Sequence, residues 1–131
     1  MKLNVMSTIA SLLSILFLSL HLTDDILRNQ AGSAQGVASL VVVLILVVWL
    51  YGTLALAEQR SGYVIKLVGS LVASLPGVLH LVGVGDVPVS QIATSSGAFF
   101  VWVVVALGAT AIFSLVLSVY GLRSLQGNQS R

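Results

Sequence analysis

Residues 37–57, VASLVVVLILVVWLYGTLALA, form the stretch that decides the fold class. The stretch contains no charged side chain, and its apolar residues are continuous instead of alternating with polar ones. A membrane-spanning helix needs about 20 predominantly apolar residues, whereas the strands of a membrane barrel alternate between apolar and polar side chains. In lipid, a single segment satisfies its backbone groups internally only as a helix. The stretch therefore predicts a transmembrane helix, although its valines would favour strands in water.

The composition of the whole chain agrees with lipid as its solvent. Hydrophobic residues make up 57% and charged residues 8% of the 131 residues, and the mean hydropathy is +1.07. In a soluble domain about a quarter of the residues are charged. The net charge of +2 comes from scattered residues without a basic run or stripe, so we expect no nucleic-acid partner. The absence of cysteine excludes disulfides and thiolate metal sites.

Three other segments are also long and apolar enough to cross a bilayer. Together the predicted spans cover about residues 5–22, 37–57, 63–82 and 97–122. The first follows Lys2 without a clear small-residue cleavage site after it, so we interpret it as an uncleaved helix and not as a signal peptide. The short polar connection 58–62 predicts a tight antiparallel hairpin. We therefore expect an all-α, polytopic membrane protein: one antiparallel four-transmembrane-helix bundle over residues 1–131.

Basic residues are distributed unevenly over the ends of these spans. Those on the side of the termini and the short hairpin are Lys2, Arg60, Lys66, Arg123 and Arg131. On the other side, Arg28 stands beside Asp24 and Asp25. Cytoplasmic loops carry the excess of Lys and Arg. We therefore expect both termini in the cytoplasm and the chain in the cytoplasmic (inner) membrane of a prokaryote.

The charged residues at the short hairpin have two interpretations. Glu58, Arg60 and Lys66 can form a solvated cluster that only sets the topology. Alternatively, Glu58 can belong to a transport path, because ionisable residues at membrane depth mark such paths. The chain has no Gly-rich phosphate loop, nucleophile elbow or catalytic-triad pattern, so its motifs point away from an enzyme.

Small residues recur at four-residue spacing in the last two predicted helices. The third helix carries Gly69, Ala73 and Gly77, and the fourth carries Ala106, Thr110, Ser114 and Ser118. Lipid gives no hydrophobic drive between helices, so small residues that allow close backbone approach hold membrane bundles together. We expect both rows to pack against other helices, with a polar path lined by the hydroxyls as the alternative.

The first predicted helix has a polar or small face of its own. Its members follow at alternating three- and four-residue steps: Ser7, Ser11, Ser14, Leu18, His21, Asp25 and Arg28. This spacing places them on one side of a helix. We therefore expect the segment HLTDDILR (21–28) to continue the first helix, with Asp24 and Arg28 paired at i,i+4.

Two histidines are predicted to lie toward the same, outer end of the bundle, because the first and third helices run in the same direction. His21, Asp25 and His80 could together bind a divalent metal such as zinc or iron, or exchange protons near neutral pH. The two histidines could instead hold a b-type haem, or each could simply bond a carboxylate or carbonyl at the interface. Further polar residues on that side are Asp24, Arg28 and Asp86.

Three stretches resemble small four-helix prokaryotic integral membrane proteins of unassigned function. They are HLTDDILR (21–28), VVWLYGTLALAEQRSGY (47–63) and SSGAFFVW (95–102). The resemblance implies a membrane-embedded helical bundle, but it brings no catalytic or binding residue with it.

Three functions are compatible with this pattern. The first is a non-catalytic integral membrane protein that acts as a subunit, scaffold or accessory partner, with the bilayer and either a second copy or another membrane protein as its partners. The second is a small oligomeric transporter or channel, although the predicted cores of the second and fourth spans contain no ionisable residue. The third is a metal- or haem-binding redox protein that uses His21 and His80. Of the three functions, the non-catalytic subunit would need no cofactor.

Overall fold

The computed structural model describes residues 3–28, 33–82 and 97–129, and four α-helices account for nearly all of them. Along the chain these helices are α1 (Leu3–Arg28), α2 (Ser33–Leu54), α3 (Arg60–Val82) and α5 (Gly97–Gln129). The all-helical prediction is thereby confirmed for the described part of the chain.

The helices α1 and α5 extend further than the apolar runs from which they were predicted. α1 continues to Arg28, so the prediction that HLTDDILR extends the first helix is confirmed. α5 continues to Gln129, well beyond the predicted span end at residue 122. The apolar run sets the length that fits a bilayer. The helix itself continues for as long as its residues tolerate helical geometry, and the polar segment RSLQGNQ contains good helix formers.

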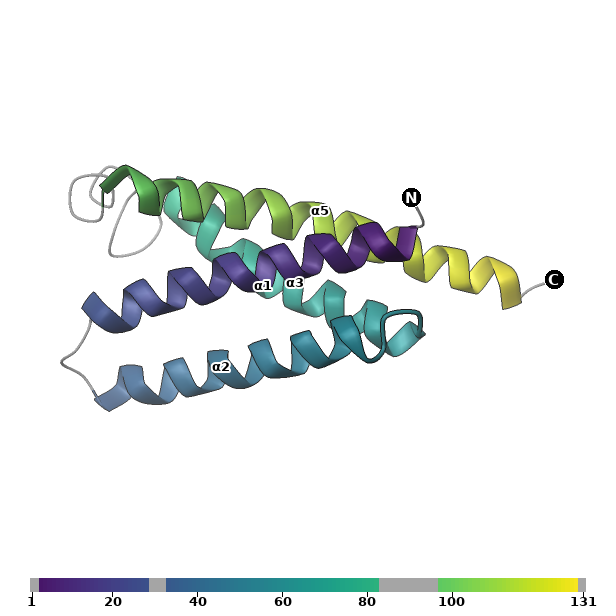
Figure 1. Ribbon diagram of the computed structural model, residues 1–131, viewed down its shortest axis with the longest axis horizontal. Helices are drawn as coiled ribbons and strands as arrows, with labels where there is room; N and C mark the ends of the chain where they lie inside the picture. The colour runs from purple at the N-terminus through teal and green to yellow at the C-terminus, as the bar shows by residue number, and fades with distance from the viewer. Residues whose placement is uncertain (1–2, 29–32, 83–96, 130–131) are drawn as a thin grey trace.

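The four helices form an elongated antiparallel arrangement in which α5 is the main packing partner of both α1 and α3 (Figure 1). α2 packs mainly on α3 and less on α1, and it forms the border of the bundle in Figure 1. We call the end with the α2–α3 turn, the start of α1 and the end of α5 the hairpin end. The opposite end, where α1 finishes and α5 begins, is the far end.

A five-residue turn, 55–59, joins α2 to α3 at the hairpin end. The amide of Gln59 donates to the carbonyl oxygen of Leu56 (3.0 Å) and closes the turn. A Cβ on Gly62 would overlap that same carbonyl oxygen, so the tight turn requires glycine at this position. The short connection predicted from the sequence is therefore a closely packed hairpin.

Two of the helices are long and apolar enough to cross a membrane. Their apolar segments are Leu3–Asp24, with a mean hydropathy of 2.0, and Ala98–Gln126, with a mean hydropathy of 2.5. The described part of α2 contributes a shorter apolar stretch, Leu40–Leu54.

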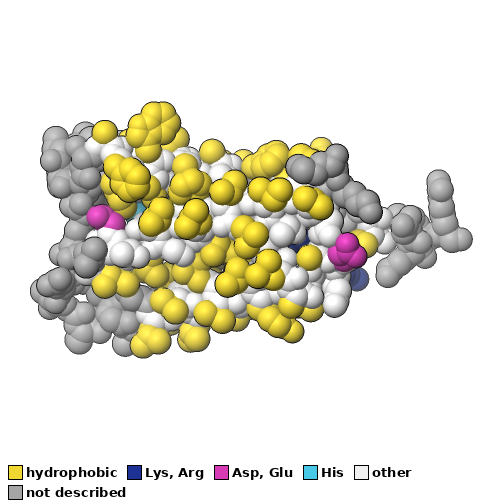
Figure 2. Space-filling model, in the orientation of Figure 1, with side chains coloured by type: hydrophobic (Ala, Val, Ile, Leu, Met, Phe, Trp, Pro, Cys, Tyr) yellow, Lys and Arg dark blue, Asp and Glu magenta, His cyan; other side chains and the backbone are white. Residues whose placement is uncertain are grey.

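The distribution of side chains is inverted relative to a water-soluble bundle. Large aliphatic residues cover much of the surface of the described helices in Figure 2. Polar side chains instead fill the interior, and all of these are fully buried: Ser7, Ser11, Ser14, Thr53, Lys66, Ser70, Ser114 and Ser118. The interior also contains one apolar cluster of Leu18, Trp49, Ala73, Leu107 and Ala111 and a second one of Phe100 and Val104.

Candidate functional site

A polar junction joins α1 to α2 inside the bundle. The indole Nε1–H of Trp49 donates to the Ser11 hydroxyl (2.7 Å), and the hydroxyls of Ser11 and Thr53 lie 2.9 Å apart. All three side chains are almost completely buried. Since Ser11 can accept from the indole and donate to Thr53, each group has a partner without water. The junction fixes the rotation of α2 relative to α1.

A second polar contact joins α3 to α5. The Ser70 hydroxyl bonds the carbonyl oxygen of Lys66 (2.6 Å) and the Ser114 hydroxyl (2.8 Å). One turn further along α5, Ser118 donates to the carbonyl oxygen of Ser114 (2.7 Å). These small side chains let the two backbones approach closely while satisfying their own hydroxyls.

Lys66 corrects the interpretation of the hairpin charges as one solvated cluster. Its side chain is fully buried, whereas Glu58 and Arg60 are exposed. The Lys66 ammonium donates to the carbonyl oxygen of Ala57 (3.2 Å) and lies 4.1 Å from the centre of the Tyr63 ring. The prediction failed because Lys66 lies on the same face of α3 as Ser70 and Ala73, which packs against α5.

Glu58 contacts α1 at the hairpin end. Its carboxylate Oε1 accepts a bond from the Asn4 side-chain amide (3.0 Å). This exposed contact ties the start of α1 to the turn. The side chain of Glu58 thus lies at the exposed edge of the bundle.

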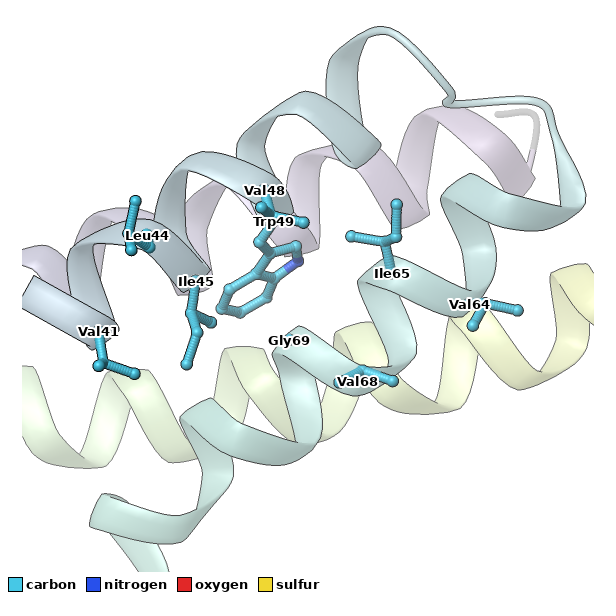
Figure 3. A pocket seen from close by; sticks show the side chains of 9 residues that line it. All are labelled: Val41, Leu44, Ile45, Val48, Trp49, Val64, Ile65, Val68 and Gly69. Carbon is cyan, nitrogen blue, oxygen red and sulfur yellow. The ribbon is translucent and has the colours of Figure 1, made fainter.

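A groove of about 390 Å³ opens on the outer side of the α2–α3 hairpin. Figure 3 shows the Trp49 ring directed from α2 toward Gly69 of α3, with valine, leucine and isoleucine side chains around them. Its nine lining residues are Val41, Leu44, Ile45, Val48, Trp49, Val64, Ile65, Val68 and Gly69. The groove therefore offers van der Waals contact and no polar recognition.

The contact of Trp49 with Gly69 forms the floor of this groove. A Cβ on Gly69 would overlap the indole ring, so only glycine lets the ring lie flat against α3. The polar edge of the indole is directed inward to Ser11, and its apolar part faces the groove. One residue thus belongs to both the polar junction and the apolar groove.

At the far end, His21 is buried and stacks on Phe100 of α5, with ring centres 5.4 Å apart and planes inclined by 24°. Asp24 lies one turn beyond His21 and is partly buried. The side chains of Asp25, Arg28 and His80 and the whole of Asp86 lie outside the described residues, so the proposed joint site stays a prediction. Among the described side chains, no group of three or more His, Asp or Glu residues could hold a metal ion.

The two rows of small residues occupy different positions. Gly69 lies against Trp49, and Ala73 is fully buried in the apolar cluster. The burial of Gly77 lies outside the described residues, so its predicted packing stays a prediction. On α5, Ser114 and Ser118 are fully buried, whereas Ala106 and Thr110 are half-buried, with the Thr110 hydroxyl bonded to the carbonyl oxygen of Ala106 (2.8 Å).

The sequence analysis did not single out Trp49, Thr53 or Lys66 as interior polar groups. One signal could have identified Lys66, because it stands four residues before Ser70 and three before Gly69, on the small-residue face of α3. The same signal exists for Trp49, which stands three residues before Gly52 and four before Thr53.

No family model, no curated protein and no solved structure matches this chain. Its function is therefore inferred from its own described residues: an interior in which most but not all hydroxyls are bonded, the buried ammonium group of Lys66, and an apolar groove on the outside.

Proposed function

We propose that this chain is a non-catalytic integral membrane subunit that crosses the bilayer four times, with both termini in the cytoplasm. The inverted distribution of side chains supports lipid as the solvent, because exposed leucine, valine and isoleucine dominate the described surface while serine and threonine lie inside. The short hairpin between α2 and α3 supports an antiparallel pair of spans. The excess of basic residues at the hairpin end supports the orientation.

The observation that carries the subunit role is the α2–α3 groove. Trp49 and Gly69 form its floor, and exposed aliphatic side chains such as Leu44 and Val68 form its walls. Association of helices in lipid depends on shape and close packing. A groove with a glycine in its floor permits close approach, so an apolar transmembrane helix of another subunit fits the chemistry of this surface.

Site-specific crosslinking tests the proposal. Because the chain has no native cysteine, only the introduced thiol of this protein can react. Leu44→Cys places a thiol in the groove wall, and Ile112→Cys places one on the exposed face of α5 as a matched control. Each thiol is first alkylated with the membrane-permeant reagent benzophenone-4-maleimide, and the benzophenone is then photolysed in native membranes so that it inserts into a C–H bond of whatever lies beside it. We expect Leu44→Cys to form one specific adduct in this way, and Ile112→Cys to form none. Equal adducts from both positions, or none from either, would contradict a groove-directed subunit.

Blocking the groove provides an independent check of the same proposal. Val68→Trp fills the groove from its outer wall, where the native side chain is 52% exposed. We expect loss of the Leu44→Cys adduct while the purified protein keeps its melting temperature. An adduct that persists in this variant would show that the partner binds elsewhere.

The redox alternative is tested by the visible spectrum and metal content of the purified protein. If His21 and His80 hold a metal or haem, His80→Gln will remove the bound group and its absorption. A native protein that lacks both metal and a haem spectrum would rule this alternative out.

A further inference from the structure

Lys66 is a buried cation, and neither of the two close contacts of its ammonium group among the described residues is with a carboxylate. Its two contacts, the Ala57 carbonyl oxygen and the Tyr63 ring, are both uncharged groups. The carbonyl takes one of the three ammonium N–H groups. A buried charge is costly unless it is paired, and ionisable groups inside membrane bundles usually mark a site.

The register of α3 against α5 places Ser118 opposite Lys66. Ser70 bonds Ser114, and Tyr63 contacts Gly121. Because α3 and α5 are antiparallel, residues that come earlier in α3 face residues that come later in α5. Between these two contacts, Lys66 therefore stands across from Ser118, whose side chain is fully buried.

The register of α1 against the α2–α3 hairpin places Ser7 at the same height in the bundle as Lys66. Ser11 bonds Thr53, and Asn4 bonds Glu58. Ser7 lies between these two contacts and therefore faces the segment that includes Ala57, the residue that accepts the Lys66 bond. The Ser7 hydroxyl is fully buried and has no hydrogen-bond partner among the described residues.

We propose that Lys66 and Ser7 bind one anionic group inside the hairpin end of the bundle. The ammonium supplies the charge and further N–H donors, and the Ser7 hydroxyl supplies an O–H donor, so an acceptor with a negative charge completes both groups. Either a free halide ion or a phosphate oxygen of an anionic lipid headgroup has this chemistry. Neither Lys66 nor Ser7 lines the groove, so this site does not depend on the subunit role.

Thermal unfolding of the detergent-purified protein tests the site and separates the two sources. One titration adds sodium chloride at constant ionic strength, with sodium gluconate as the replaced salt. The other adds phosphatidylglycerol to neutral micelles, with phosphatidylcholine as its control. A ligand that binds only the folded protein raises the melting temperature in a concentration-dependent way. A rise that depends on chloride identifies a free ion, and one that requires phosphatidylglycerol identifies a headgroup.

Three variants assign the effect to these residues. Lys66→Gln should abolish the rise, and Arg60→Gln, which removes an exposed charge at the start of α3, should leave it unchanged. Ser7→Ala should weaken the apparent affinity by about tenfold, the usual loss for a hydrogen bond to a charged group. It should not lower the melting temperature in gluconate, because it removes an unpartnered buried hydroxyl.

If Lys66→Gln fails to fold, the weaker apparent affinity expected for Ser7→Ala still tests the site. A native protein whose melting temperature responds to neither chloride nor phosphatidylglycerol would overturn the proposal. So would an equal loss of the response in Arg60→Gln, because the effect would then come from surface charge.

Discussion

The two faces of α3 form very different contacts with their neighbours. Toward α5, Ser70 bonds Ser114 and the ring of Tyr63 lies on Gly121, so the helices meet closely along their length. Toward α2, the contact depends on Trp49 over Gly69, and a groove of about 390 Å³ remains beside it. We call these contacts the closed seam and the open seam.

The difference follows from the size of the side chains in each seam. Small residues on both sides of the closed seam let the backbones approach and let hydroxyls bond across it. The open seam combines one glycine with a large ring and branched aliphatic residues, which keep the helices apart on the outer side. Under the proposed membrane assignment, lipid can occupy this gap and a partner helix can displace it.

The largest effect is expected from adding volume to the closed seam. Ala73 is fully buried in the apolar cluster, so Ala73→Leu should destabilise the protein by about 1–3 kcal/mol, the usual range for overpacking. Val68→Leu adds volume at the groove of the open seam and should change stability by less than about 0.5 kcal/mol. Melting temperatures in detergent provide the comparison, and equal losses would show that the open seam is as tightly packed as the closed one.

Glycine substitutions sharpen the comparison. A Cβ at Gly121 would overlap the ring of Tyr63, and one at Gly69 would overlap the ring of Trp49. We expect Gly121→Ala to cost about 1–2 kcal/mol and Gly69→Ala about half as much, because the Trp49 ring has the groove beside it. Denaturant unfolding in mixed micelles measures both, and the reverse order would contradict the distinction between the seams.

A smaller loss than that from overpacking is expected when a hydroxyl of the closed seam is removed. Ser114→Ala should cost about 0.6 kcal/mol, the average for hydrogen bonds between membrane helices, because Ser70 keeps its bond to the Lys66 carbonyl. Ser11→Ala leaves both Trp49 Nε1 and Thr53 without their partner and should cost more, about 1–2 kcal/mol. A larger loss for Ser114→Ala in the same unfolding assay would show that the Ser70 bond to the backbone does not compensate.

Helices were easier to predict from the sequence than the contacts between them. Continuous apolar runs such as residues 41–50 predict a helix in lipid because no other single segment satisfies its backbone there. The polar face of α1 was also visible, and the structure buries Ser7, Ser11 and Ser14 on it. Hydropathy did not identify the end of α5 at Gln129, because helix formation does not require apolar residues.

The candidate sites were harder to predict for a physical reason. Lys66 was interpreted as solvated from its nearness to the hairpin, but its position on the face of α3 that packs against α5 decided its burial. The Trp49 contact depends on the rotation of α2, and the apolar run of residues 41–50 carries no signal for that rotation; only Gly52 and Thr53 mark the inward face. Partners across helices, such as Ser11 and Thr53, follow only once that rotation is known.

The central claim is that lipid covers the apolar surface of the bundle. Val47 lies in the middle of the apolar part of α2 and is 59% exposed, and Ser61 at the start of α3 is also exposed. The most direct measurement is labelling of Val47→Cys and Ser61→Cys with a membrane-impermeant maleimide, in intact cells and in permeabilised cells. We predict no labelling of Val47→Cys in either case and labelling of Ser61→Cys only after permeabilisation. Labelling of Val47→Cys in the folded protein would contradict the claim, because an exposed thiol that reacts in water is not covered by lipid.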